Sequence, residues 1–144
     1  MIDPKAISQD LLDRSGAAYL SGKADAFVQC FALPHVIRTF ETVQVIETRA
    51  DLLAIFDAMR AYFRKVGLTD MVRHCLSAHL VGETTIRATH ESRYLSGTCL
   101  VQRPIVAMST LRRIDDVWYV TEGQYAIQDA ADHVTALTRR HASE

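Results

Sequence analysis

Three stretches in the first half of the chain repeat hydrophobic residues at the period of an α-helix. The first begins at Asp3, which can cap free amide groups, and ends at Gly22. A shorter one covers about residues 23–31, before Pro34, and a third runs from the capping-box-like residues 48–51 to about residue 66. We therefore expect three helices. Their buried faces would be Ile7, Leu11, Ser15, Ala18 and Tyr19, then Phe27, Cys30 and Phe31, then Leu52, Ile55, Phe56, Met59, Phe63 and Val66.

The other periodic segments are typical of β-strands. Two short strands are expected over residues 35–40 and 43–48. Four longer strands follow, over residues 70–80, 84–95, 103–114 and 117–128, and a final helix over residues 130–142 is capped by Asp129. Long antiparallel strands twist and curl. The pattern thus predicts a single α+β domain over residues 1–144. In it a curved antiparallel β-sheet, a half-barrel cone, wraps around the three helices of the N-terminal half, with a C-terminal helix.

Alternation along each strand predicts which side chains face the inside of the cone, because successive residues point to opposite faces. The more apolar set contains His74 in the strand 70–80 and His90 in the strand 84–95. In the last strand it contains Thr121 and Tyr125, so Trp118, Val120 and Glu122 would face outward. A β-bulge would invert this assignment for all residues beyond it.

The strand 103–114 is apolar on both faces. Ile105, Ala107 and Leu111 form one face, and Val106 and Met108 lie on the other. The convex face therefore needs a second cover. We expect a homodimer through this face, because a second copy is the simplest supplier of a matching surface. Trp118 and Val120 of the neighbouring strand would join the interface.

Composition and charge exclude few classes of protein, but they narrow the choice of partners and of cellular location. The chain has 16 basic and 17 acidic residues and a net charge of −1, which argues against a nucleic-acid binder. No apolar run is long enough for a membrane span, and no signal peptide is visible. The three cysteines are widely spaced, without a metal-ligand pattern. A cytoplasmic location without a metal, cofactor or membrane partner is expected.

Two segments resemble the SnoaL-like, nuclear-transport-factor-two-like superfamily. Residues 21–32 are similar to its passage from the first helix to the second: a small residue, Gly, hydrophilic residues, then Phe-x-x-x-Phe-Ala. Residues 111–118 resemble its last hairpin, with a basic strand end, an acidic turn and Trp. The resemblance implies a cone with an internal pocket and a dimer through the convex face. The superfamily includes isomerases, dehydratases, epoxide hydrolases, cyclases and transport factors, so the fold implies little about activity.

The ketosteroid isomerases of this superfamily give a sharper comparison, because they resemble the chain around Gly22 without a gap. The position of their oxyanion-stabilising tyrosine falls on Ser15, and that of their proton-shuttling aspartate falls on Thr39. A hydroxyl cannot replace a carboxylate as the base that removes a carbon-bound proton, since its pKa is far too high. The resemblance therefore argues against that reaction.

The remaining candidate chemistry rests on histidines and hydroxyl groups. His90 and His74 are either general acid–base candidates in the cone or core histidines hydrogen-bonded to a neighbour. Tyr19, Thr121 and Tyr125 are candidate ligand-binding hydroxyls, together with Ser15 and Thr39. A metal site at His74, His79 and His90 fails because His79 has the opposite parity, and no carboxylate is assigned to the inside.

Three functional hypotheses remain open at the level of sequence. The first is a protein that binds a mainly apolar small molecule in the cone pocket. The second is a cofactor-independent isomerase, dehydratase or hydrolase with an inward histidine as base and Tyr19 or Tyr125 polarising the substrate. The third is a protein-interaction module that uses its outer face. A pocket with hydroxyls, one or two histidines and no assigned acid favours binding over catalysis.

Overall fold

The computed structural model describes residues 2–125 and has three helices in this part of the chain. They are α1 (Pro4–Ser21), α2 (Ala24–Val28) and α3 (Arg49–Val66). Asp3 accepts a hydrogen bond from the amide of Ala6 at 3.1 Å, and Thr48 caps α3 in the same way. Gly22 and Gly67 end the two long helices with φ of 74° and 70°, the left-handed conformation that glycine adopts without strain. These boundaries confirm the predicted ends of both long helices.

Within residues 2–125, seven strands form one curved sheet in the order β2-β1-β7-β6-β4-β3, with the short β5 paired to β4. Their bounds are β1 (Phe31–Arg38), β2 (Val43–Ile46), β3 (Asp70–Leu80), β4 (Thr85–Ser96), β5 (Cys99–Leu100), β6 (Ile105–Ile114) and β7 (Val117–Tyr125). All neighbours are antiparallel except β1 and β7, which are parallel. The α+β class and the curved, open sheet agree with the prediction, whereas β5 was not predicted.

The predicted second helix is too long. It was expected to continue to residue 31 and to end before Pro34. The helix ends at Val28, and β1 runs from Phe31 through Pro34. Pairing with β2 begins only at His35, and the register with β7 shifts between Phe31 and Val36. Proline, which has no N–H to donate, is therefore tolerated at this irregular stretch of strand.

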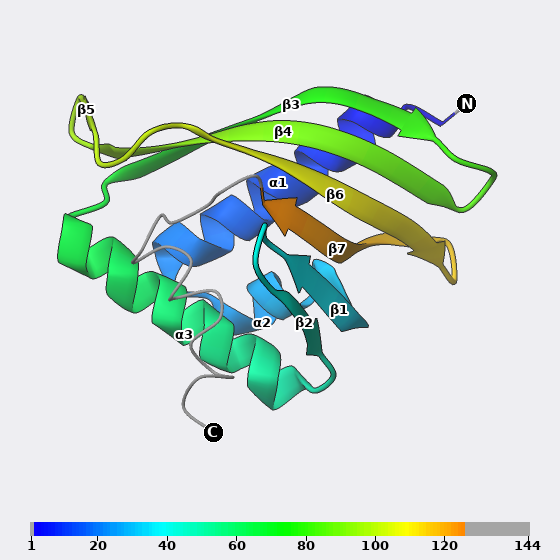
Figure 1. The fold of residues 1–144 in the computed structure, drawn as a ribbon, viewed down its shortest axis with the longest axis horizontal. Helices are drawn as coiled ribbons and strands as arrows, with labels where there is room; N and C mark the ends of the chain where they lie inside the picture. Colours follow the sequence, from blue (N-terminus) through cyan, green and yellow to red (C-terminus); the bar gives the residue numbers. More distant parts are fainter. Residues whose placement is uncertain (1, 126–144) are drawn as a thin grey trace.

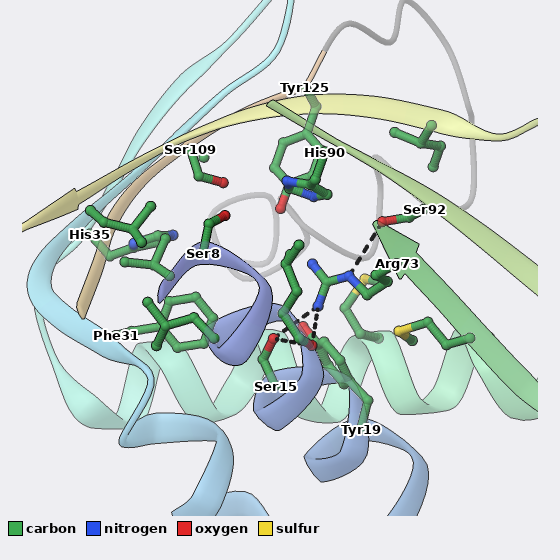
Figure 2. A pocket seen from close by; sticks show the side chains of 18 of the residues that line it. Ser8, Ser15, Tyr19, Phe31, His35, Arg73, His90, Ser92, Ser109 and Tyr125 are labelled. Atoms are coloured by element: carbon green, nitrogen blue, oxygen red, sulfur yellow. Dashed lines mark hydrogen bonds between the residues drawn. The ribbon is translucent and has the colours of Figure 1, made fainter. Parts of the chain in front are cut away.

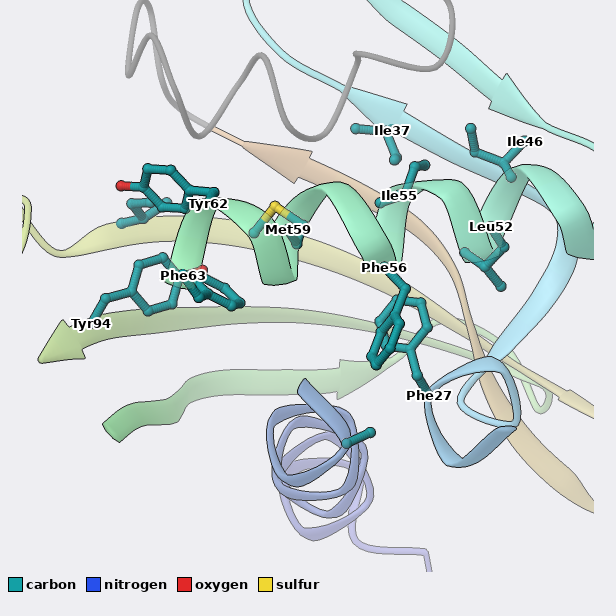
Figure 3. Close-up of a cluster of buried hydrophobic side chains, with 12 residues drawn as sticks. Phe27, Ile37, Ile46, Leu52, Ile55, Phe56, Met59, Tyr62, Phe63 and Tyr94 are labelled. Atoms are coloured by element: carbon teal, nitrogen blue, oxygen red, sulfur yellow. The ribbon is translucent and has the colours of Figure 1, made fainter. Parts of the chain in front are cut away.

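The long strands β3, β4 and β6 arch over α1, and α3 lies on the other side of α1 (Figure 1). One hydrophobic cluster surrounds α3, where Phe56 packs against Phe27 with ring centroids 4.8 Å apart and Phe63 meets Tyr94 at 5.3 Å (Figure 3). A second cluster fills the space between α1 and the sheet and includes Leu11, Leu12, Ile86 and Leu111. The apolar stripe predicted for α3 is thus core.

Two predictions fall outside the described part of the chain. The final helix over residues 130–142, with its cap at Asp129, and the end of the last strand at residues 126–128 lie beyond residue 125. Within residues 2–125, none of the helices combines the length and the apolar character that crossing a bilayer requires.

A β-bulge in β3 overturns the predicted orientation of its first half. Cys75 pairs with His90, but Ser77 pairs with Thr89, so Leu76 is an extra residue without a partner on β4. Before the bulge, Met71, Arg73 and Cys75 face the helices, and His74 is exposed. After it, Ala78 faces inward as predicted. The prediction that His74 faces the cone is therefore wrong.

A second bulge does the same in β7. Thr110 pairs with Glu122 and Leu111 with Val120, which leaves Thr121 as the extra residue. Gly123 and Tyr125 face inward as predicted, but Val120 and Trp118 also pack against the inner cluster. The predictions that Thr121 points inward and that Trp118 and Val120 lie on the outer face are wrong, because one inserted residue inverts the alternation.

Candidate functional site

An interior cavity of about 60 Å³ lies between α1 and the concave face of the sheet. A buried water needs roughly 10–15 Å³ on a comparable scale, so the cavity has room for a few waters or a small organic group. Helix α1 supplies one wall, β3, β4, β6 and β7 supply the other, and Met59 of α3 closes one side. The polar lining residues in the described part of the chain are Ser8, Ser15, Tyr19, His35, Arg73, His90, Ser92, Tyr94, Ser109 and Tyr125.

Arg73 is the charged residue of this lining, and three neutral oxygens hold it. Its Nη1 donates to Ser15 Oγ at 2.9 Å and to the Leu12 carbonyl at 3.4 Å, and its Nε donates to Ser92 Oγ at 3.3 Å. Ser92 is its direct cross-strand partner on β4. In Figure 2 the guanidinium lies between Ser15 and Ser92, with His90 and Tyr125 across the cavity. The bulge at Leu76 is what turns Arg73 inward.

His90 and His35 are neutral at physiological pH. Each is only 4% exposed. Burial, reinforced by the nearby Arg73 charge, lowers the pKa of His90 to about 3. Burial likewise lowers the pKa of His35 to about 4, although a hydrogen bond to the backbone of Val120 and the charge of Glu122 oppose the shift. In both residues Nδ1 is buried and makes no hydrogen bond within residues 2–125.

Three tyrosines complete the lining as protonated hydroxyl groups. Burial raises the pKa of Tyr19, Tyr94 and Tyr125, and the Arg73 charge opposes the rise in each case. Tyr19 stacks on Phe56 with centroids 5.4 Å apart, which fixes its ring in the aromatic core beneath the cavity. These residues are hydrogen-bonding groups and not bases at neutral pH.

The structure brings four of the predicted site residues together and leaves three outside. Ser15, Tyr19, His90 and Tyr125 line the cavity. His74 is exposed on the outer face of β3. Thr39 lies at the β1–β2 turn, where its hydroxyl is 2.8 Å from that of Thr42, and Thr121 donates to the Thr110 carbonyl at 3.2 Å beside the outer face.

Arg73, His35 and Ser8 are lining residues that the sequence analysis missed. Arg73 was assigned outward because the apolar residues of β3 were counted over the whole strand, and Leu76 and Leu80 outweighed Met71 and Cys75. A change of apolar parity halfway along the strand was the available signal. His35 and Ile37 alternate as buried residues in β1, but the chemistry of His35 was not considered.

The described lining contains neither aspartate nor glutamate. Glu122, whose charge acts on His35, is instead paired with Arg38 at 3.2 Å. Asp70 is exposed at the start of β3. Within residues 2–125, His, Cys, Asp and Glu side chains do not gather in any group of three or more that could hold a metal ion. Among the described residues, therefore, the site offers a cation, neutral imidazoles and hydroxyls.

Sequence comparison alone assigns no family: no protein-family model matches this chain, and no curated protein is significantly similar to it. Structural comparison is informative. A domain of unknown function with a cystatin-like fold from Nostoc punctiforme superposes with a TM-score of 0.68 at 14% identity, covering 96% of this chain and 86% of that one.

Two further structures carry functional descriptions. A candidate ketosteroid isomerase from Shewanella frigidimarina has a TM-score of 0.65 at 16% identity, covering 83% of this chain and 94% of its own. A candidate dehydratase of the NTF2-like family from Streptomyces avermitilis has a TM-score of 0.63 at 16% identity, covering 88% and 96%. At such low identities the likeness concerns the backbone. The chain has the cystatin-like, NTF2-like fold that its sequence resemblance implied.

Proposed function

We propose that this chain binds a small organic molecule in the cavity between α1 and the sheet. The observation that carries the proposal is the pair of orphaned histidine nitrogens. Nδ1 of His35 and Nδ1 of His90 are buried and have no hydrogen-bond partner within residues 2–125, and both residues line the same cavity. A buried polar atom without a partner costs about 1–3 kcal/mol, so a fold keeps two of them only where something else satisfies them. A ligand with polar atoms fits this requirement.

Catalysis of the kind named for two structural neighbours has less support. Isomerisation and dehydration by this fold use an inward acid, or an acid paired with a histidine, according to the resemblance. The described cavity lining has no such acid. A histidine whose pKa is about 3 is also a weak base at neutral pH. The enzyme alternative therefore keeps only the neutral His90 and the tyrosine hydroxyls, and binding is the better-supported function.

A cavity-filling substitution tests the proposal. Ser109 lines the cavity from β6, whereas its neighbour Thr110 lies on the outer side of the same strand. Ligand-observed NMR with a library of small polar fragments should find binders that shift the imidazole signals of His35 and His90. Ser109→Leu should abolish these shifts, and Thr110→Leu is the matched control that should retain them. If the folded Ser109→Leu variant still binds these fragments, the binding site lies elsewhere.

Two further properties are proposed on sequence grounds. We propose that the protein acts in the cytoplasm and that it forms a homodimer through the convex face of the sheet. The exposed side chains of Val106 and Met108 on β6 support the second proposal.

A further inference from the structure

Arg73 brings a positive charge into the cavity that no side chain of the described lining neutralises. The three groups that hold it are two serine hydroxyls and a backbone carbonyl, all of them neutral. Residues 2–125 contain no acidic side chain paired with it. The two histidines of the lining are neutral as well. The described lining therefore carries a net charge of about +1 at neutral pH, because the guanidinium stays protonated.

The hydrogen bonds of Arg73 leave one end of its guanidinium for a ligand. Arginine has five N–H donors. Nε and Nη1 are directed to Ser92, Ser15 and Leu12, while Nη2 has no partner among the described residues. The group is thus held on one side by protein, and Nη2 remains as a donor on the other side. Nη2 can donate to a carboxylate oxygen, and such a charge-assisted bond is stronger than a bond between neutral groups.

The elements around Arg73 fix this arrangement. Helix α1 passes the arginine stem at Gly16, where a Cβ would make ordinary contacts with Arg73 Cδ at 3.7 Å and with Met71 Sδ at 3.6 Å. The bulge at Leu76 turns Arg73 inward, and Ser15 and Ser92 fix its head from two different elements. Strand pairing and two serine hydroxyls therefore hold the guanidinium at the cavity.

The cavity's shape and polarity restrict the ligand. Its apolar wall residues, which include Leu11, Leu12, Met71, Ile105 and Leu111, suit an apolar part of the ligand. The volume of about 60 Å³ favours a short molecule. His90 and Tyr125 lie across from the guanidinium (Figure 2). Neutral hydrogen-bonding groups there suit a carbonyl or hydroxyl on the far end of the ligand.

We propose that the ligand is a small monocarboxylic acid whose carboxylate pairs with Nη2 of Arg73 and whose apolar body lies against the α1 wall. This proposal rests on the proposed function, because it requires the cavity to be a binding site. It goes further in naming the charged group of the ligand and the residue that selects it. A carboxylate would also supply the counter-charge that the described lining lacks.

Matched pairs of acid and amide test the proposal on the full-length protein. Acetate, butyrate and benzoate are compared with acetamide, butyramide and benzamide by calorimetry and by the ¹⁵N signal of Arg73 Nε, in a carboxylate-free buffer. The acid of at least one pair should bind about tenfold to a hundredfold more tightly than its amide. Arg73→Met should remove that difference, while Arg103→Met, at an exposed arginine outside the cavity, should keep it. Arg73→Met should fold, since an apolar side chain of similar length replaces an unpaired charge; a thermal melt checks this.

The outcomes separate this proposal from the one on which it rests. Acids and amides that bind equally, with binding lost in Ser109→Leu, would overturn the carboxylate assignment and leave the binding site intact. Failure of all six compounds, together with an absence of fragments that shift His35 and His90, would overturn both. Inorganic phosphate that binds more tightly than every acid, and depends on Arg73, would replace the carboxylate by a phosphate. An acid preference that survives Arg73→Met would also refute the proposal.

Discussion

His90 is a histidine that the fold keeps neutral. It was predicted to point into the cone, and it does so because β4 alternates without a bulge from Ile86 to Tyr94. The same burial that gives it a place in the cavity lowers its pKa to about 3. Its value to the site is therefore hydrogen bonding rather than charge.

The lowered pKa has a measurable effect on stability. Above pH 6.5 the histidine is neutral in both the folded and the unfolded chain, so it has no effect. Below pH 6.5 the unfolded chain takes up the proton first, and the free energy of unfolding falls by up to about 1.4 kcal/mol per pH unit until about pH 3. We expect His90 alone to cost about 2 kcal/mol between pH 7.5 and pH 5.

Urea unfolding at several pH values measures this effect. The loss of stability between pH 7.5 and pH 5 should be about 2 kcal/mol smaller in His90→Gln than in the unsubstituted protein. His74→Gln changes an exposed histidine on β3 and is the matched control. His35 adds a similar term, since its pKa is lowered to about 4, so the double variant with His35→Gln should have the flattest profile. Parallel profiles for His90→Gln and the unsubstituted protein would contradict the buried, neutral histidine.

At the scale of elements, the two long helices were predictable and the orientation of two strands was not. The caps at Asp3 and Thr48 and the glycines at the helix ends act within a few residues, so the local sequence contains the whole signal. A β-bulge depends on how one strand pairs with another, and each bulge inverts every side chain beyond it. The predictions for Tyr125 and His90 therefore held, while those for His74 and Thr121 failed.

The predictions for the site residues divide in the same way, between local signals and strand pairing. Residues on α1 and on the regular strand β4 were placed correctly, as Ser15, Tyr19 and His90 illustrate. Arg73 was missed because its orientation is set by Leu76, three residues away, through pairing with β4. Thr39 was assigned to the site by resemblance alone, and the turn after β1 holds it away from the cavity.

Two glycines, one within α1 and one at its C-terminal end, should change the stability of the fold in opposite directions when each is replaced by alanine. Gly16 lies within the helix, and a Cβ there makes only ordinary contacts at 3.6 and 3.7 Å, so Gly16→Ala should stabilise the fold by roughly 0.5–1 kcal/mol. Gly22 has φ of 74°, and its Cβ would meet the Arg60 guanidinium at 3.0 Å. Gly22→Ala should therefore destabilise the fold by about 1–2 kcal/mol. Urea unfolding of both variants checks the signs, and shifts in the same direction would refute this account of α1.

At the scale of the whole molecule, the outer face of the sheet exposes apolar side chains of β6. Val106 and Met108 on β6 are 41% and 46% exposed. Arg87 and Glu122 stand on either side of β6 in one row, since both pair with Thr110. A two-fold axis along β6 would set Arg87 opposite the partner's Glu122 and stack the apolar strands, so this face is complementary to itself.

Sedimentation velocity tests this assembly. We expect the unsubstituted protein to be a dimer at micromolar concentration and Met108→Glu to be a monomer, because the variant would bury a carboxylate at the centre of the interface. Leu100→Glu places the same charge on an exposed apolar residue of β5 and should remain dimeric. A monomeric unsubstituted protein would leave the outer face to a different partner and refute the homodimer.

The extra residue at Leu76 also bears on which side chains line the cavity. If the first half of β3 instead slipped by one residue, so that Leu76 paired with His90, the bulge would disappear and His74 would replace Arg73 opposite Ser92 in the cavity wall. Such a change of register would exchange a fixed cation for a titratable imidazole without altering the helices or the strand order. The interior chemistry of this fold therefore depends on strand register as well as on which residues the strands contain.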